Sequence, residues 1–124
     1  AIVGNGRLVG APLARLWLSA GLDVTVYDDT TTNLQESLRN ADIIVTATGV
    51  PGLITSAMVA PGKVVVDAGT ASENGVIVGD VAPAVRERQD LTITPTIGGV
   101  GPLTITSLFD NVITAARKTV PTES

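Results

Sequence analysis

The chain begins Ala1-Ile2-Val3-Gly4-Asn5-Gly6-Arg7-Leu8-Val9-Gly10, a segment with the pattern of a strand, a glycine turn and the start of a helix. Glycines at such a turn let the backbone bend sharply and approach a pyrophosphate closely, while the N-terminus of the helix offers free N–H groups to the anion. The segment therefore predicts a dinucleotide site. Its third glycine comes one residue later than in the usual Gly-x-Gly-x-x-Gly pattern, so a glycine turn with only a structural role is the alternative.

The next segment indicates which dinucleotide is preferred. Residues 22–27 alternate apolar and polar side chains as a strand does, and Asp28-Asp29 follow, about 20 residues beyond the glycine turn. A carboxylate at this place can accept hydrogen bonds from the adenosine 2′-OH, whereas a 2′-phosphate would meet like charge. The two aspartates therefore favour NAD over NADP. They can also form a solvated turn and helix cap with residues 30–33, and the two roles are compatible.

The composition fits a single α/β domain. The 124 residues are enough to bury a core. Because 44% of them are hydrophobic but only 2% are aromatic, that core must consist of Val, Ile, Leu and Ala. Strands that are buried on both faces of a parallel sheet read as continuous apolar runs. Ile43-Ile44-Val45 and Val64-Val65-Val66 are such runs, which predicts a parallel sheet with helices on both sides.

The charge and the residue types exclude several classes of function. A formal net charge of −4 without a cluster of Lys or Arg argues against binding to nucleic acid or to an anionic membrane. The chain has no Cys and no His, which excludes disulfides and thiol catalysis and removes the commonest general base and metal ligand. No apolar stretch reaches the length of a membrane span and no charged leader precedes a hydrophobic segment, so we expect a cytoplasmic location.

The order of elements predicts a Rossmann-like, doubly wound parallel sheet in three α/β/α layers over residues 1–120, with a tail over 121–124. Strands are expected before Gly4 and at 22–27, 42–48, 63–68 and 91–93. Helices are expected at 9–20, 32–39 and 55–59, from 80 or 81 onward, and from Pro102 onward. Residues 70–78 are expected to be irregular, with a turn at Ser72-Glu73-Asn74-Gly75.

Three conspicuous loops follow predicted strands, at 48–52, 67–70 and 94–102. In a doubly wound sheet, ligands bind outside the carboxyl ends of the strands, at the point where the strand order reverses. These loops should therefore line one cleft. The alternative is that each Gly or Pro only marks a turn.

Several segments, taken in order, resemble the methylenetetrahydrofolate dehydrogenase/cyclohydrolase family. They are residues 4–12, 46–54, Val66-Asp67-Ala68-Gly69, Gly79-Asp80-Val81 and residues 98–104. The resemblance covers essentially the whole chain but only the C-terminal, nucleotide-binding half of the family's two-domain protein, and Gly98-Gly99-Val100-Gly101-Pro102 is its most specific element. It implies hydride transfer from the methylene bridge of 5,10-methylenetetrahydrofolate to NAD(P), followed in many members by hydrolysis of the methenyl product.

The resemblance also implies roles for individual residues. Near the pyrophosphate and adenosine it places Gly4, Asn5, Gly6, Leu8, Val9 and Gly10. Along the cofactor it places Ala47, Thr48 and Gly49, and near the nicotinamide Thr70, Gly101 and Thr104. Gly98 and Gly99 would border the folate side of the cleft, where the absence of side chains lets the backbone approach a flat ring.

The chain departs from the family's pattern in two places. Many NADP-using members carry Arg-Ser at the position of Asn5-Gly6 and a polar pair such as His-Ser at the position of Asp28-Asp29, so these departures again favour NAD. The family's Pro-Val-Pro before the glycines is Pro95-Thr96-Ile97 here, which lacks the rigid proline next to Gly98.

We assign no catalytic residue to this chain. In the family, a Tyr-x-x-x-Lys helix of the preceding domain supplies the lysine that assists folate chemistry, whereas Lys63 and Lys118 are expected to be solvated charges. The resemblance implies a folate substrate bound through that N-terminal domain, and a homodimer. A stand-alone, non-catalytic NAD-binding module and another small-acid dehydrogenase of the same fold are the alternatives.

Overall fold

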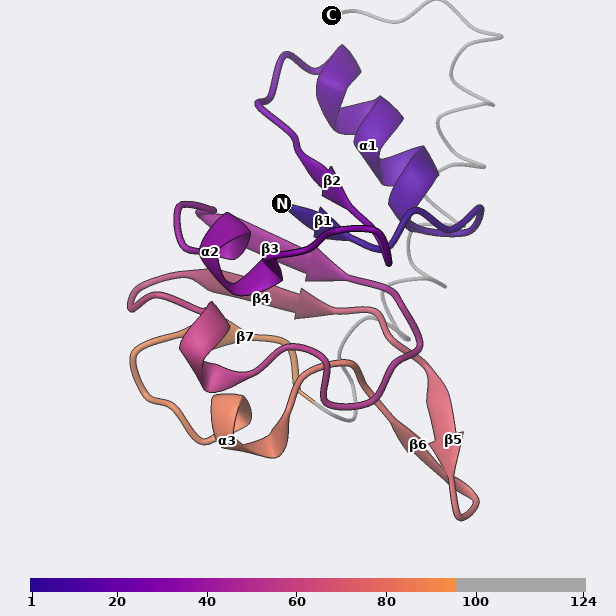
Figure 1. The fold of residues 1–124 in the computed structure, drawn as a ribbon, viewed down its shortest axis with the longest axis vertical. Helices are drawn as coiled ribbons and strands as arrows, with labels where there is room; N and C mark the ends of the chain where they lie inside the picture. Colours follow the sequence, from indigo (N-terminus) through magenta and orange to yellow (C-terminus); the bar gives the residue numbers. More distant parts are fainter. Residues whose placement is uncertain (96–124) are drawn as a thin grey trace, which may run out of the picture.

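The computed structural model describes residues 1–95, and within them short strands alternate with helices along the chain (Figure 1). In chain order the elements are β1 (Ile2–Val3), α1 (Gly10–Ser19), β2 (Val26–Tyr27), α2 (Leu34–Leu38), β3 (Ile43–Thr46), the 3₁₀ helix η1 (Ser56–Met58), β4 (Val64–Asp67), β5 (Ala71–Glu73), β6 (Val76–Val78), α3 (Pro83–Arg86) and β7 (Thr92–Ile93). The predicted helix from Pro102 and the predicted tail at 121–124 lie outside the described residues.

Five strands form one parallel sheet in the order β2-β1-β3-β4-β7. The chain moves from β1 to β2 in one direction and from β2 to β3 in the other, so the strand order reverses between β1 and β3. This topology confirms the Rossmann-like, doubly wound α/β fold. Because the strands are parallel, the residues that follow β1, β2, β3 and β4 all emerge at the same edge of the sheet, to the right in Figure 1.

The core follows from the alternation of side chains along the strands. The register pairs Val3 with Thr46 and Ile44 with Val65, which places all four on one face of the sheet. That face packs against buried side chains from α2, from the segments on either side of η1, and from α3 and the segment just before it: Leu38, Ile54, Val59, Val81 and Val85. The other face carries the buried Ile2 and Val45 and has α1 against β1. Branched aliphatic side chains therefore fill the core, as the composition predicts.

The structure corrects two predicted elements. The strand expected at 22–27 is reduced to Val26–Tyr27, because β2 lies at the edge of the sheet and only β1 pairs with it. Residues 70–78, expected to be irregular, form the antiparallel hairpin β5–β6, which projects beyond the sheet (Figure 1). Its turn is Asn74-Gly75, with φ of 52° and 80°, the left-handed pair that a two-residue hairpin needs.

Helix α1 also buries less than its pattern predicts. The apolar residues recur at helical spacing, yet Leu16 is 65% exposed while Ala14 is 6% exposed. Ala14 has a small side chain, which fits where α1 lies close to the sheet.

Candidate functional site

The glycine turn between β1 and α1 is held by close backbone contacts. Gly4 has φ of +105°, and a Cβ on it would lie 2.6 Å from the carbonyl oxygen of Ala47. A Cβ on Gly10 would lie 1.9 Å from the carbonyl oxygen of Gly4. These two glycines therefore let α1 and the loop after β3 approach the end of β1, which is the packing role of glycines in this motif. The extra residue before the third glycine does not disturb this packing.

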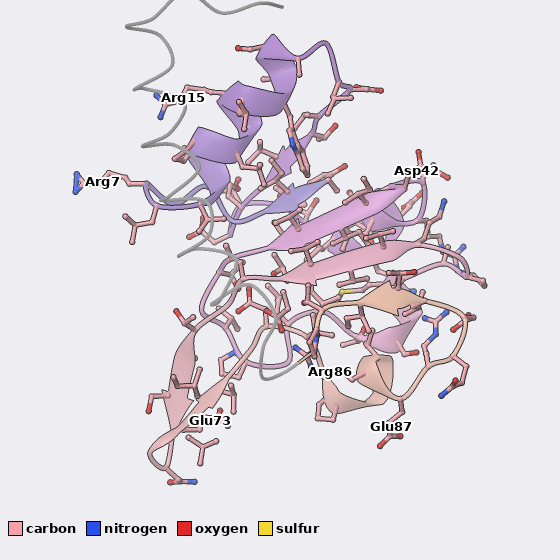
Figure 2. The ribbon with its side chains drawn as sticks, turned by 180° about the vertical axis from the view of Figure 1, so that it is seen from behind. Arg7, Arg15, Asp42, Glu73, Arg86 and Glu87 are labelled. Atoms are coloured by element: carbon pink, nitrogen blue, oxygen red, sulfur yellow. The ribbon has the colours of Figure 1, made fainter. Side chains whose placement is uncertain are left out.

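Gly6, at the tip of the same turn, has a different environment. Among residues 1–95, and leaving aside Gly6 and its two chain neighbours, no atom lies within 4 Å of the place where its Cβ would be. The described part of the chain thus leaves the outer side of the turn open, as an approaching anion requires. Around it Asn5, Arg7 and Leu8 are exposed, Leu8 by 94%. Figure 2 shows the side chain of Arg7 pointing away from the ribbon, and Val9 is half-buried at the helix start.

The end of β2 lies beside this turn, because the N–H of Gly4 donates to the carbonyl oxygen of Tyr27 at 2.7 Å. Asp28 and Asp29 come next and are both exposed. The Oδ1 atom of Asp28 accepts from the N–H of Thr30 at 2.9 Å and from its hydroxyl at 2.5 Å. The hydroxyl and N–H of Thr30 hold the pKa of Asp28 below its usual range. Asp28 therefore closes a turn, and the cap of α2 is Asn33.

The loop after β3 adjoins the glycine turn from the other side. Ala47 and Thr48 are half-buried and Gly49 is exposed with φ of +71°. The side chain of Thr48 lies against Gly4, since its Cγ2 would be 3.3 Å from a Cβ there. Thr70 is exposed at the base of the hairpin, on the same edge of the sheet. Gly98, Gly99, Gly101 and Thr104, which the resemblance places near the nicotinamide and the folate, lie outside the described residues.

Sequence reasoning did not find the buried polar cluster at this edge. Asp67 ends β4 with its side chain 2% exposed, and Asp80 follows β6 and is 0% exposed. The guanidinium of Arg86 lies 2.5 Å from Oδ2 of Asp67, and Figure 2 shows this arginine pointing from α3 toward the strands. The available signal was an acidic residue directly after a buried apolar run, at Val66-Asp67. That Asp80 lies beside Asp67 can be predicted only when the topology of the chain is known.

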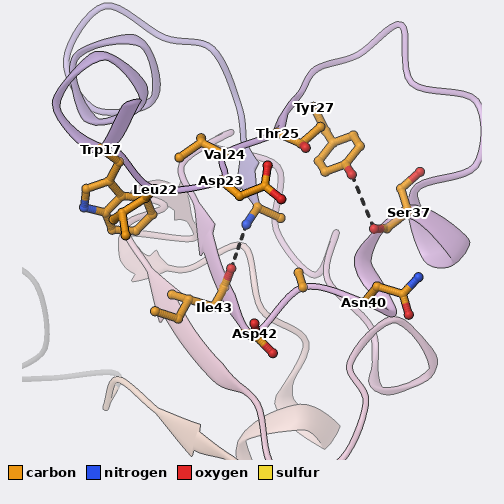
Figure 3. A pocket seen from close by; sticks show the side chains of 12 residues that line it. Trp17, Leu22, Asp23, Val24, Thr25, Tyr27, Ser37, Asn40, Asp42 and Ile43 are labelled. Carbon is orange, nitrogen blue, oxygen red and sulfur yellow. Dashed lines mark hydrogen bonds between the residues drawn. The ribbon is translucent and has the colours of Figure 1, made fainter. Parts of the chain in front are cut away.

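A separate cavity of about 450 Å³ opens at the opposite edge of the sheet. Figure 3 shows it between Trp17 and Leu22 on one side and Tyr27 and Ser37 on the other, with Asp23 and Asp42 at its centre. Because Asp42 precedes β3 and Asp23 precedes β2, this cavity lies at the amino ends of the strands. It is therefore distinct from the edge that carries the glycine turn.

Residues 1–95 hold neither a candidate metal centre nor a candidate membrane span. They contain no group of three or more acidic, His or Cys side chains placed to hold a metal ion. Within the same residues, no helix is long and apolar enough to cross a membrane.

The comparison with known families agrees with the geometry of the glycine turn. Residues 1–120 match the family described as tetrahydrofolate dehydrogenase/cyclohydrolase, NAD(P)-binding domain. The chain belongs to this family. Its NAD(P)-binding fold is thus established by sequence as well as by the order of the strands.

Relatives of this dehydrogenase/cyclohydrolase domain are longer than the chain. The bifunctional protein FolD of Methanospirillum hungatei is 47% identical over 116 residues, which cover 94% of this chain and 42% of that protein. The bifunctional protein FolD of Bordetella avium is 42% identical over 120 residues, which cover 96% of this chain and 42% of that protein. The chain thus spans about two fifths of the length of these relatives.

Solved structures of the family have the same fold. The bifunctional 5,10-methylenetetrahydrofolate dehydrogenase/cyclohydrolase from Thermoplasma acidophilum superposes with a TM-score of 0.83 at 38% identity, covering 94% of this chain and 42% of that one. The Trypanosoma brucei enzyme, solved with NADP cofactor and inhibitor, gives a TM-score of 0.81 at 34% identity and covers 98% and 44%.

Proposed function

We propose that this chain is the cofactor-binding domain of a 5,10-methylenetetrahydrofolate dehydrogenase, in which hydride passes from the methylene bridge of the folate to NAD in preference to NADP. Family membership supports the reaction class. The single observation that carries the cofactor preference is the pair of exposed carboxylates, Asp28 and Asp29, beside the glycine turn.

The open turn fits a dinucleotide in the way this proposal needs. The open outer side of Gly6 would receive the pyrophosphate, and the loop Ala47-Thr48-Gly49 would run along the cofactor, with Thr70 toward the nicotinamide. Nicotinamide, when bound, supplies the hydride acceptor. In Asp28 one carboxylate oxygen serves the turn to Thr30, so the other oxygen and Asp29 would accept from the adenosine 2′-OH. A 2′-phosphate would meet both negative charges at short range.

Calorimetric titration of the chain with NAD and with NADP tests this preference. We expect tighter binding of NAD, and we expect the variant Asp28→Ser/Asp29→Arg to shift the NADP-to-NAD affinity ratio toward NADP by about tenfold or more, equivalent to about 1.4 kcal/mol. The matched control is Asp23→Ser/Asp42→Arg, which makes the same charge change at the opposite edge of the sheet and should leave the ratio unchanged. An unchanged ratio in the first variant would refute the assignment of the two aspartates.

The folate reaction requires a second experiment. We propose that the folate substrate binds through an N-terminal domain, as the family resemblance implies, since the chain covers only 42% of a longer relative such as the Methanospirillum hungatei protein. Joined to the folate-binding domain of such a relative, the chain should form reduced nicotinamide from 5,10-methylenetetrahydrofolate, and cyclohydrolase activity is measured on the same fusion with methenyltetrahydrofolate. The expected homodimer rests on the family resemblance and is checked by light scattering.

A further inference from the structure

The two buried carboxylates at the cofactor edge of the sheet have no part in the function proposed above. We infer that Asp80 is a positioning residue, which holds the loop Ala47-Thr48-Gly49 in the conformation that dinucleotide binding needs. This inference rests on the proposed function, because the loop matters only if it lines the cofactor.

The contact between Asp80 and the loop is direct. Its Oδ2 atom accepts from the backbone N–H of Thr48 at 2.7 Å and from the hydroxyl of Thr46 at 2.6 Å. Both distances are short for hydrogen bonds to a carboxyl oxygen. The hydroxyl of Thr48 in turn accepts from the N–H of Val50 at 3.1 Å. These hydrogen bonds therefore link Asp80 to Thr48 in the middle of the loop and, through Thr48, to Val50.

Asp80 is itself held from two sides. The carboxylate of Asp67 accepts from the N–H of Asp80 at 3.1 Å and from that of Val81 at 3.2 Å. The N–H of Ile54 donates to the carbonyl oxygen of Asp80 at 3.0 Å. The ion pair between Asp67 and Arg86 holds the first of these supports against α3. These hydrogen bonds hold the backbone at Asp80 in place, and the position of its carboxyl group next to Thr48 is thereby fixed.

Two glycines make room for this arrangement. A Cβ on Gly69 would lie 2.1 Å from Oδ1 of Asp80, and a Cβ on Gly79 would lie 2.0 Å from Oδ2 of Asp67. Each carboxylate therefore occupies the space of a side chain on the opposite segment. Because Asp80 is 0% exposed, it reaches the cofactor only through Thr48 and not by contact.

Burying Asp80 is energetically unfavourable, and this distinguishes a positioning role from ordinary packing of the core. Its Oδ1 atom is buried and has no hydrogen-bond partner within residues 1–95. A buried carboxylate with a free oxygen is an unfavourable way to fill a core. What the carboxylate supplies at this position is a strong acceptor for the Thr48 N–H, at the point where the sheet gives way to the loop.

The test compares Asp80→Asn with Thr46→Val in the full chain. Asp80→Asn keeps the size of the side chain but removes its charge, whereas Thr46→Val removes a bond to the same oxygen and leaves the Thr48 bond in place. We expect Asp80→Asn to weaken NAD binding about tenfold in calorimetry and to speed amide exchange at Thr48 in NMR. We expect Thr46→Val to bind NAD within about twofold of wild type even though its Tm also falls.

The possible failures are distinguishable. If wild type binds neither NAD nor NADP, the proposed function fails and this inference with it. If wild type binds NAD and Asp80→Asn binds it equally, or if both variants lose the same affinity, only the positioning role is overturned. If Asp80→Asn does not fold, the rate of amide exchange at Thr48 in the wild-type chain tests the positioning role instead. Exchange as slow as that of Val45 in β3 supports a loop held before cofactor binds, and exchange as fast as that of Gly49 overturns it.

Discussion

Asp28 shows how two interpretations of one residue can be compatible. The sequence presented it either as a ribose acceptor or as part of a solvated turn. The structure confirms the turn, through the bonds that Thr30 donates to one carboxylate oxygen, and leaves the ribose role as a prediction. The turn also orients the carboxylate, because an acceptor fixed on one oxygen presents the other in a defined direction. Helix capping belongs instead to Asn33, which the sequence placed only at the end of the same polar run.

Removing the Thr30 hydroxyl should raise the pKa of Asp28 toward its ordinary value of 3.8. A lowered pKa in the folded state means that the carboxylate stabilises the fold above its unfolded pKa and loses this contribution as the pH falls through the folded value. Thr30→Val should therefore reduce the acid sensitivity of stability that stems from this residue. NMR titration of the Asp28 carboxyl measures the change, with Thr32→Val as the exposed control. Identical pKa values in Thr30→Val and wild type would contradict the assignment.

The two glycines at the middle and end of the turn, Gly6 and Gly10, should respond differently to alanine. Gly10→Ala places a methyl group 1.9 Å from the Gly4 carbonyl oxygen, so it should cost about 2–4 kcal/mol of unfolding free energy. Gly6→Ala meets open space and should change stability by less than about 0.5 kcal/mol, while weakening NAD binding if the pyrophosphate lies there. Urea unfolding measures the first effect and calorimetry the second. Equal stability losses would show that Gly6 is also a packing glycine.

At the scale of elements, the sequence predicted what depends on local patterns. The apolar runs at β3 and β4 and the glycine turn form where expected, and the helix with Pro83 in its first turn forms but begins at Pro83 rather than at residue 80 or 81. Two errors have physical causes. β2 is an edge strand with one partner, which alternation alone cannot reveal, and the strands of the β5–β6 hairpin have only three residues each, too few to show a periodicity. The Asn74-Gly75 pair was nevertheless a recognisable hairpin signal.

The hairpin turn should control the local stability of β5 and β6 without affecting the sheet. Asn74 has φ of 52°, a conformation that alanine adopts at a cost of about 1 kcal/mol while glycine adopts it freely. Asn74→Ala should therefore speed amide exchange of Val76 and Val78 several-fold, and Asn74→Gly should not. The amides of β3 and β4 serve as internal controls, because they belong to a different sheet. Equal exchange in the two variants would contradict a turn-controlled hairpin.

At the scale of the whole molecule, the candidate site is produced by topology. Gly4, Asp28 and Thr48 are far apart in the chain, and the parallel order β2-β1-β3 brings their loops to one edge. That assembly could be predicted, since the rule for doubly wound sheets states where the loops meet. The Asp67–Asp80 cluster could not, because it depends on how the chain returns from the hairpin to the sheet. Side-chain partners 13 residues apart leave no periodic signal.

The ion pair between Arg86 and Asp67 should be the one that matters for global stability, because it joins α3 to β4 and, through a bond to the carbonyl oxygen of Thr94, to the end of β7. Arg86→Met leaves a carboxylate whose side chain is 2% exposed without its cation, so we expect a loss of about 3–5 kcal/mol in urea unfolding. Lys63→Met removes the same charge from the pair with Asp42, which is 94% exposed, and should cost less than about 1 kcal/mol. In Arg86→Met the backbone N–H groups that bind Asp67 remain, so the loss in this variant should lie toward the lower end of the range of about 3–5 kcal/mol. A loss in Arg86→Met no greater than in Lys63→Met would mean that those N–H groups alone satisfy the buried charge.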